Sequence, residues 1–219
     1  YHEARARGGV ALSILEATGV HPSGPMTLNA WDDAIVPRYR ELARRMHAHG
    51  MRIFSQLNHL GLEQGAPGER PWSASALVAP FSGQRALAMD AERIAAVVAG
   101  FAAAARRARE GGLDGVEVHC AHGHLLQQFL SPLTNRREDD YGGGEARRRR
   151  FVHEVLQACR DAVGADFVLG IRVGPQRLAG GLGVDEHVAL VRWLESTRLV
   201  DYVRVSHGSL YNAHRIIGG

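Results

Sequence analysis

Five short runs of mostly apolar residues, each bounded by glycine or polar residues, predict β-strands in this chain. Between the runs, apolar residues recur at steps of three and four, which is typical of helices that bury one face. The predicted strands cover residues 10–15, 52–57, 115–119, 167–173 and 200–206.

Four helices are predicted in the intervals between the strands. The second ends before Gly111 and Gly112, because paired glycines commonly stop a helix. The fourth begins near Asp185, whose carboxylate can cap a helix N-terminus. The apolar stripes are Ile35, Tyr39, Leu42 and Met46 in a helix over residues 32–49; Ile94, Val97, Val98, Phe101 and Ala105; Phe151, Val155 and Leu156; and Val188, Val191 and Leu194.

Strands that alternate with helices predict an α/β fold in which parallel strands are joined by right-handed crossovers. Two architectures fit this pattern, a doubly wound open sheet and a (β/α) barrel. No Gly-x-Gly-x-x-Gly turn follows the first strand, which disfavours the dinucleotide-binding form of the open sheet. The long stretch 61–84 contains Gly, Pro and Ser residues, and we expect it to be a loop that lines a site.

The composition is that of a single folded domain, with 219 residues of which 45% are hydrophobic and 22% charged. No run of about 18 apolar residues occurs, so we expect no membrane partner. Cys120 and Cys159 cannot build a disulfide framework, which favours a reducing, cytoplasmic setting. The first residues lack the charged and then apolar pattern of an export signal, so none is expected.

The charge pattern does not indicate a nucleic-acid partner. All 26 basic residues are arginine, against 23 acidic residues. The densest basic stretch, Arg147–Arg150, has no interleaved aromatic residues and leads directly into an apolar helix. A solvated or phosphate-facing helix start is therefore the favoured interpretation.

Hydrogen-bonding side chains gather at the carboxyl ends of the predicted strands. In a (β/α) barrel these ends converge on the catalytic face, so this distribution indicates a site rather than packing alone. The residues are 16–18 after the first strand, Gln56 and His59 with the second, His119, Cys120, His122 and His124 with the third, Arg172 in the fourth, and Ser206 and His207 with the last.

Two features of this set leave alternatives open. Arg172 lies within a predicted buried strand, and a structural carboxylate and an anionic ligand are equally good partners for it. His119, His122 and His124 are too close together to be unrelated core histidines. They suit zinc, as in a hydrolase, or they could bind a substrate oxygen and donate a proton to carbon.

A longer pattern spans residues 114–143. It comprises Asp114-Gly115-Val116-Glu117-Val118-His119-Cys120-Ala121-His122-Gly123-His124, Ser131-Pro132-Leu133-Thr134-Asn135-Arg136-Arg137 and Asp140-Tyr141-Gly142-Gly143. This pattern resembles the old yellow enzyme family. Residues 54–59 resemble the third-strand motif of that family and residues 170–173 its fifth-strand motif, with weaker similarity from Arg5 to Ser206.

The resemblance implies a TIM-type (β/α)8 barrel that binds FMN and passes hydride from NADH or NADPH to a small-molecule substrate, an activated alkene such as an α,β-unsaturated carbonyl. By position, Gln56 would contact the pyrimidine edge of the flavin and Arg172 its N1 and O2 atoms. Ala17, placed after its strand, would offer backbone contact near the ring. His119 and His122 match the pair that holds the substrate carbonyl oxygen.

The sequence also departs from the family pattern. His124 stands where the family has a tyrosine that donates a proton to the α-carbon, so we expect His124 to be a proton donor or a substrate contact. The turn from Gly142 to Arg148 has lost polar side chains. The five predicted strands correspond to strands two to six, so residues 1–219 would be a partial barrel, with strand one before Tyr1 and strands seven and eight after Gly219.

A hypothesis of another class is a non-catalytic barrel fragment that acts only within an assembly. A homo-oligomer is compatible with either hypothesis. The residues alone do not decide the substrate or the choice between NADH and NADPH.

Overall fold

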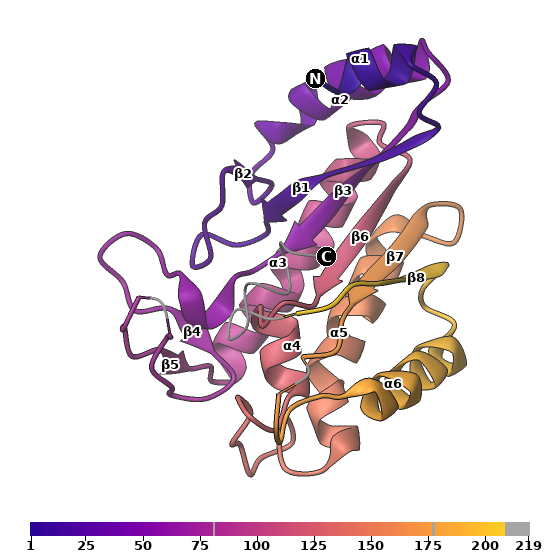
Figure 1. Cartoon of the computed structure of the whole chain (residues 1–219). Helices are drawn as coiled ribbons and strands as arrows, with labels where there is room; N and C mark the ends of the chain where they lie inside the picture. The colour runs from indigo at the N-terminus through magenta and orange to yellow at the C-terminus, as the bar shows by residue number, and fades with distance from the viewer. Residues whose placement is uncertain (81, 177, 209–219) are drawn as a thin grey trace.

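A six-stranded parallel sheet forms the centre of the computed structural model, which describes residues 1–80, 82–176 and 178–208 (Figure 1). Apart from the two-residue β2, the strand order follows the chain in one direction. A (β/α) barrel has this order, whereas a doubly wound sheet reverses at its switch point, so the barrel prediction is confirmed over the described strands. In sheet order they are β2 (Leu28–Asn29), β1 (Leu12–Gly19), β3 (Arg52–Asn58), β6 (Gly115–Cys120), β7 (Val168–Val173) and β8 (Tyr202–Val205).

Helices cover one face of this sheet. In Figure 1, α3 (Ala91–Glu110) and α5 (Glu145–Val163) lie behind the strands, where they pack against each other. Their predicted stripes are buried, since Phe101 and Phe151 are both 0% exposed. The other elements are α1 (His2–Arg7), α2 (Ile35–His47), α4 (Leu125–Leu130), α6 (Val184–Thr197), the 3-10 helix η1 (Gly61–Glu63) and a small ladder of β4 (Trp72–Ser73) and β5 (Leu87–Ala88).

Alternation along β6 separates two environments. Val116, Val118 and Cys120 belong to the hydrophobic core between the sheet and the helices. Glu117 and His119 point to the opposite, inner face, because successive side chains of a strand alternate. These two are also buried, with 0% and 2% of their surface exposed, so the inner face is polar and needs hydrogen-bond partners.

The first strand differs from its prediction at both ends. β1 starts two residues later than predicted and continues to Gly19, so Ala17 and Thr18 lie within the strand and not after it. The register between β1 and β3 shifts between Ile14 and Ala17, which interrupts the two-residue alternation that identifies a strand in a sequence. The Thr18 hydroxyl is buried and accepts a hydrogen bond from Ser55 at 3.2 Å.

Other predicted bounds are corrected by one to three residues. The helix predicted over 32–49 is α2, and the strands predicted over 167–173 and 200–206 shorten to β7 and β8. The prediction of Asp185 as an N-cap is wrong. Gly183 is the N-cap residue of α6, and its N–H donates to the Glu186 carboxylate at 2.9 Å, which leaves Asp185 in the first turn.

The predicted loop 61–84 contains two short ordered elements, η1 and β4. Gln128 of α4 anchors it, because its Oε1 accepts from the Leu62 N–H and from the Ser73 hydroxyl, both at 3.1 Å. Gly61 has a φ of +67°, and a Cβ there would lie 2.4 Å from the Gln128 amide oxygen. Glycine is therefore required at this position, and the loop is held beside α4.

Cys120 and Cys159 are free thiols buried in the core. Burial raises the pKa of the Cys159 thiol to about 12, so it stays protonated at neutral pH. Within the described ranges, none of the helices has the length and apolarity that crossing a bilayer requires.

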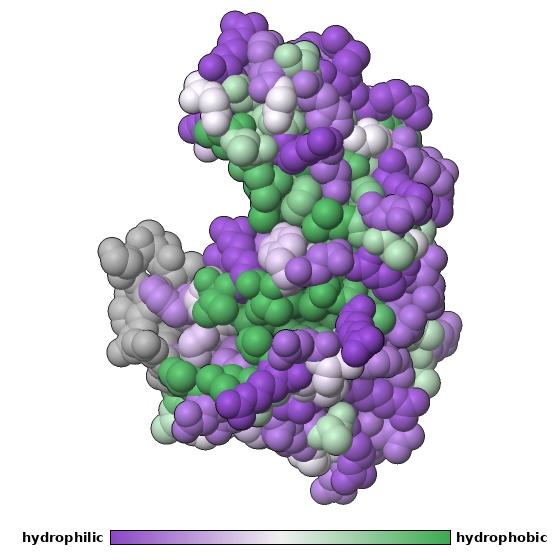
Figure 2. All heavy atoms as spheres, turned by 90° about the vertical axis from the view of Figure 1, so that its right-hand side faces the viewer, coloured by the Kyte–Doolittle hydropathy of each residue, from purple (hydrophilic) through white to green (hydrophobic). Residues whose placement is uncertain are grey.

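One face of the molecule carries exposed apolar surface. Figure 2 shows the side on which β8 and α6 lie, and hydrophobic surface gathers in its middle between hydrophilic regions above and below. Val205 of β8 is 68% exposed, and Val184 and Val188 of α6 are 56% and 45% exposed. Apolar side chains beside an edge strand form a surface on which another protein segment can pack.

Two aspartates fix the register of neighbouring strands. Asp114 Oδ2 accepts from the Ile53 N–H at 2.9 Å, while the Asp114 N–H donates to the Ile53 carbonyl at 3.0 Å. Asp201 repeats this arrangement with Leu169, at 2.7 and 2.8 Å. Each carboxylate also pairs with an arginine. These contacts hold β3 against β6 and β7 against β8 in one register.

Replacing Asp114 by Ala is expected to lower the free energy of unfolding by about 1–3 kcal/mol, because the Ile53 N–H loses its acceptor. Urea denaturation measures this change. Asp161→Ala is the control, since Asp161 is exposed and accepts a hydrogen bond from Gln157 on its own helix, and we expect it to stay within about 0.5 kcal/mol of the wild type. Equal stabilities of the two variants would contradict the role of Asp114.

His59 is a buried histidine whose two ring nitrogens are engaged. Its Nδ1 accepts from the Gly61 N–H at 3.0 Å, so Nε2 carries the hydrogen and donates to the Ser23 hydroxyl at 2.9 Å. Ser23 lies 2.8 Å from His21 Nδ1. Burial, together with His21 and His124, lowers the pKa of His59 to about 3. His59 therefore links the segment after β1 to the end of β3 as an uncharged group.

Stability is expected to decrease as the pH falls below 6.5, the ordinary pKa of histidine. The unfolded chain takes up a proton at His59 there while the folded chain does not, so the folded state is favoured above this pH and loses that advantage towards pH 3. One such group changes the free energy of unfolding by up to about 1.4 kcal/mol per pH unit. The free energy of unfolding of His59→Leu should change less steeply with pH than that of the wild type between about pH 4.5 and 6.5. An equal slope would contradict the assignment of His59 as an uncharged buried group.

Candidate functional site

In-register pairing arranges the inner-face side chains in two rows across the sheet. In one row Ala17 pairs with Gln56, and Gln56 with Glu117. In the next row His119 pairs with Arg172. Successive residues on one face of a strand lie roughly 7 Å apart, so the residues predicted from four different strands come together on one surface.

The three predicted histidines form one cluster at the end of β6. His119 Nε2 lies 3.1 Å from His122 Nδ1, and His122 Nε2 lies 2.9 Å from the Ser206 hydroxyl. The ring of His124 stacks on that of His119, with centroids 4.5 Å apart and an interplanar angle of 26°. The structure thus brings together the residues that the sequence predicted at this strand end.

The backbone after β6 makes this clustering possible. His122 has a φ of 59°, in the left-handed region that few residues other than glycine adopt. The next residue, Gly123, has a φ of 82°, and its N–H donates to Gln127 Oε1 at 2.6 Å. Such strain is typical of functional loops that the surrounding structure holds in place.

Hydrogen bonds assign the ring protons of two of the histidines. The Ala121 N–H donates to His119 Nδ1 at 3.5 Å, so His119 carries its hydrogen on Nε2 and donates it to His122 Nδ1. His122 then donates from Nε2 to Ser206. A ligand oxygen bound by both imidazoles would replace these internal hydrogen bonds.

The three imidazoles are uncharged at neutral pH. Burial is the largest cause of the lowered pKa of each ring, and the cationic Arg172 lowers it further. The pKa of His122 falls to about 4 and that of His124 to about 3, while the pKa of His119 lies well below its ordinary value. The cluster therefore offers neutral hydrogen-bond donors and acceptors.

The cluster lacks the geometry of a metal centre. The stacked rings of His119 and His124 lie in nearly parallel planes, so their nitrogens do not converge on one point. In the part of the chain that the structure describes, no group of three or more His, Cys, Asp or Glu residues is placed to hold a metal ion. The zinc interpretation of the histidine spacing is therefore not supported.

Arg172 is half-buried beside this cluster. Its Nε is buried without a hydrogen-bond partner in the described chain. The buried carboxylate of Glu117 pairs with Arg204 instead, at 3.3 Å. Burial and repulsion from Arg204 lower the pKa of Arg172, while Glu117 opposes this change. Glu117 stabilises the charge of Arg172 without a hydrogen bond to its buried Nε, and this donor fits an anionic or electron-rich ligand.

Glu117 organises the row that contains Gln56. Its carboxylate, 0% exposed, accepts from Gln56 Nε2 at 2.6 Å, the Tyr202 hydroxyl at 3.2 Å and Arg204 at 3.3 Å. Tyr202 reaches it across Gly170, where a Cβ would lie 2.1 Å from the tyrosine ring. Because the amide nitrogen of Gln56 is held by Glu117, its Oε1 is left as an acceptor for a ligand.

Four polar residues of this face were not predicted from the sequence, and these are Asn58, Glu117, Tyr202 and Arg204. Alternation contains a signal for all four. Glu117 lies two residues before His119 and Asn58 two residues after Gln56, and Arg204 and Tyr202 lie two and four residues before Ser206. Ala17 pairs with Gln56 and lies inside β1, not after it.

The arginine run on α5 makes surface contacts. Arg149 pairs with Glu145, and Arg150 pairs with Asp140 and Glu154. Arg150 is exposed, whereas Arg149 is partly buried and Arg148 Nε donates to the Leu130 carbonyl at 2.9 Å, so only part of the run is solvated.

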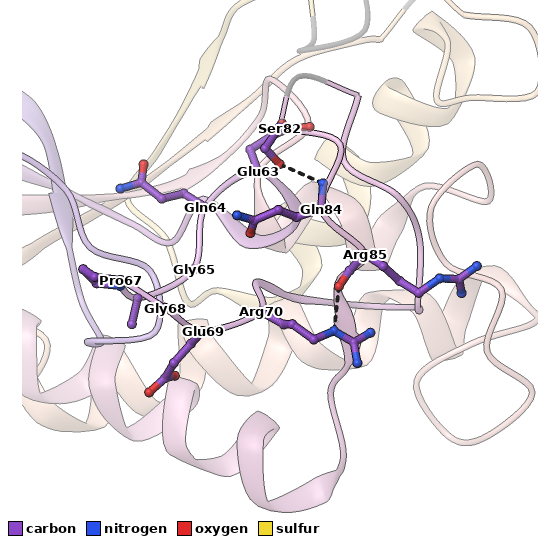
Figure 3. A pocket seen from close by; sticks show the side chains of 11 residues that line it. Glu63, Gln64, Gly65, Pro67, Gly68, Glu69, Arg70, Ser82, Gln84 and Arg85 are labelled. Carbon is purple, nitrogen blue, oxygen red and sulfur yellow. Dashed lines mark hydrogen bonds between the residues drawn. The ribbon is translucent and has the colours of Figure 1, made fainter.

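A cavity of about 600 Å³ lies within the segment that follows β3 (Figure 3). Its two arginines are engaged with backbone carbonyls, Arg70 with Arg85 at 2.8 Å and Arg85 with Ala76 at 3.3 Å. None of the predicted site residues lines it. Its walls are residues 63–70 together with Ser82, Gln84 and Arg85.

Comparison with known proteins identifies the family. Residues 1–215 match the NADH:flavin oxidoreductase / NADH oxidase family. The chain is 37% identical over 216 residues to an NADPH dehydrogenase of Listeria monocytogenes, covering 97% of this chain and 63% of that protein. It is 38% identical over 219 residues to a multifunctional alkene reductase/demethylase of Caballeronia cordobensis, covering 96% of this chain and 32% of that protein.

The fold agrees with this match. A 2-naphthoyl-CoA reductase in complex with 2-naphthoyl-CoA superposes with a TM-score of 0.91 at 26% identity, over 97% of this chain and 35% of that one. The chain spans less than two thirds of the length of the NADPH dehydrogenase, at 63%. A family match over residues 1–215 and the shared barrel architecture lead to one conclusion: the chain belongs to the NADH:flavin oxidoreductase / NADH oxidase family, the family of old yellow enzyme.

Proposed function

We propose that this chain provides the site of an FMN-dependent oxidoreductase that passes hydride from NADPH or NADH to an activated alkene, such as an α,β-unsaturated carbonyl. The observation that carries the proposal is the buried Arg172 Nε, which has no hydrogen-bond partner among the described residues, beside the three-histidine cluster on one sheet face. The NADPH dehydrogenase and alkene reductase among the relatives support this reaction class.

The inner face fits a flavin ring at two side chains. Arg172 offers a buried donor and a positive charge to the electron-rich pyrimidine side of the ring. Gln56 offers its Oε1, since Glu117 holds the amide nitrogen at 2.6 Å. Ala17 lies beside Gln56, and its small side chain leaves room above the strand. Hydride transfer between a nicotinamide and an alkene is the chemistry that FMN supplies when bound.

His119 and His122 would bind the carbonyl oxygen of the substrate. Their Nε2–H groups now donate to His122 and Ser206, and an incoming oxygen would take both hydrogen bonds. Donation to the carbonyl withdraws electron density from the conjugated alkene, which makes its β-carbon a better hydride acceptor.

His124 would contact the substrate as a neutral group. With a pKa of about 3, its imidazolium form is present in roughly one molecule in 10⁴ at pH 7. Proton donation by that form is rare at neutral pH. We therefore propose that a ring N–H of His124 donates a hydrogen bond to the substrate in the position of the family's tyrosine.

The first test measures FMN binding by the purified protein. The quenching of flavin fluorescence during a titration reports the binding. Arg172→Met should weaken FMN binding by about 10- to 100-fold, because a charged donor is lost. Arg44→Met, whose guanidinium is exposed and paired with Glu41 on α2, is the control and should bind as the wild type does. A wild-type protein that binds no FMN would overturn the proposed function.

The second test compares reduction of a cyclic enone by wild type and His124→Phe between about pH 6 and 8. We expect the variant to be slower by about tenfold, and by the same factor throughout, because a neutral N–H does not titrate in this range. His153→Phe, on the exposed side of α5, serves as the control. A wild-type rate that rises tenfold for each unit of falling pH, with no such rise in the variant, would instead assign His124 as an imidazolium donor. An unchanged rate in His124→Phe would contradict both roles.

A further inference from the structure

Asn58 and His124 meet at the carboxyl end of the sheet although 66 residues separate them. Asn58 is the last residue of β3 and is 0% exposed. Its Nδ2 lies 3.0 Å from His124 Nδ1, and its Oδ1 lies 3.3 Å from the same nitrogen. The amide of Asn58 therefore determines the hydrogen-bonding role of His124 Nδ1.

The surroundings of Asn58 favour one orientation of its amide. Nδ2 is the closer atom to His124, and it also lies 3.5 Å from Met26 Sδ, a weak acceptor. An amide nitrogen between two acceptors donates to both. Since a neutral imidazole carries one hydrogen, an Nδ1 that accepts from Asn58 places the hydrogen on Nε2.

His124 differs from its two neighbours in what its Nε2 contacts. His119 Nε2 is engaged with His122, and His122 Nε2 with Ser206. Among the described residues, no hydrogen-bond partner lies at Nε2 of His124, which belongs to a partly exposed residue. The stacking of His124 on His119 at 4.5 Å holds the plane of the ring. Asn58 then selects which nitrogen carries the hydrogen within that plane.

We infer that Asn58 is a positioning residue that holds His124 in its Nε2–H tautomer, so that His124 presents a hydrogen-bond donor to the substrate. This inference rests on the proposed function for its role in catalysis. The tautomer itself is a property of the protein without cofactor or substrate. An Asn at position 58 thus complements the histidine that replaces the family's tyrosine.

Nitrogen NMR of protein labelled with ¹⁵N-histidine tests the inference directly. Protonated and unprotonated ring nitrogens have well-separated shifts, and His124→Phe identifies the His124 signals by their loss. We expect Nδ1 of His124 to show the shift of an unprotonated nitrogen and Nε2 that of a protonated one in the wild type at neutral pH. A protonated Nδ1 in the wild type would overturn the inference.

Two variants at position 58 provide the matched comparison. In Asn58→Asp the carboxylate can only accept, so the hydrogen should move to Nδ1 of His124 and the Nδ1 shift should change to that of a protonated nitrogen. In Asn58→Leu neither nitrogen is selected, and both shifts should move to intermediate values. Gln157→Glu is the control, because the Gln157 side chain is bonded to Asp161 on α5, away from this contact, and it should leave the His124 shifts unchanged. An Nδ1 that stays unprotonated in Asn58→Asp would also contradict the inference.

The outcomes separate the inference from the proposed function. The spectra require no FMN and no alkene, so a protein that fails to bind flavin overturns the function and leaves the tautomer assignment standing. A flavin-binding, alkene-reducing protein with Nδ1 of His124 protonated supports the function and overturns the inference.

Discussion

The two-residue alternation of the parallel strands is the constraint on which the rest of the structure depends. It sends the apolar residues of β6 to the helices and sends Glu117 and His119 to the inner face. In-register pairing then places Gln56 beside Glu117 and Arg172 beside His119. A slip of one residue would bury these polar groups among the helices. The hydrophobic core and the candidate site therefore require the same register, and the aspartates at the strand starts help to hold it.

Burial determines the chemical state of the residues on this face. The Glu117 carboxylate is stabilised by three donors from two strands, β3 and β8, so its charge is balanced within the protein. The histidines respond differently, because they lose their charge when buried. Arg172 retains an unsatisfied donor beside them. The inner face therefore combines one site for an electron-rich group with one for a neutral oxygen, as a flavin and a carbonyl substrate would require.

Local sequence patterns were sufficient to predict most of the strands and helices and the candidate site residues. Periodicity placed five strands and four helices to within a few residues, and polar groups at strand ends located the histidine cluster. The prediction failed where alternation was interrupted, at the register shift before Ala17. It also overlooked Glu117, because a single carboxylate in an apolar strand gives no indication of which partners will neutralise its charge. The family pattern suggested roles for single residues, and the contacts among them came from the structure.

The sequence by itself determined the α/β alternation and the set of residues able to do chemistry, since these follow from spacing along the chain. The tertiary structure decided which of those residues touch. Two of these contacts join distant parts of the chain, namely Asn58 with His124 and Glu117 with Arg204. A third, the stacking of His124 on His119, depends on a turn. Such contacts are set by strand register and by the left-handed turn at His122, which no local pattern specifies. The physical reason is that a hydrogen bond depends on distance and direction in space, and these exist only once the sheet is assembled.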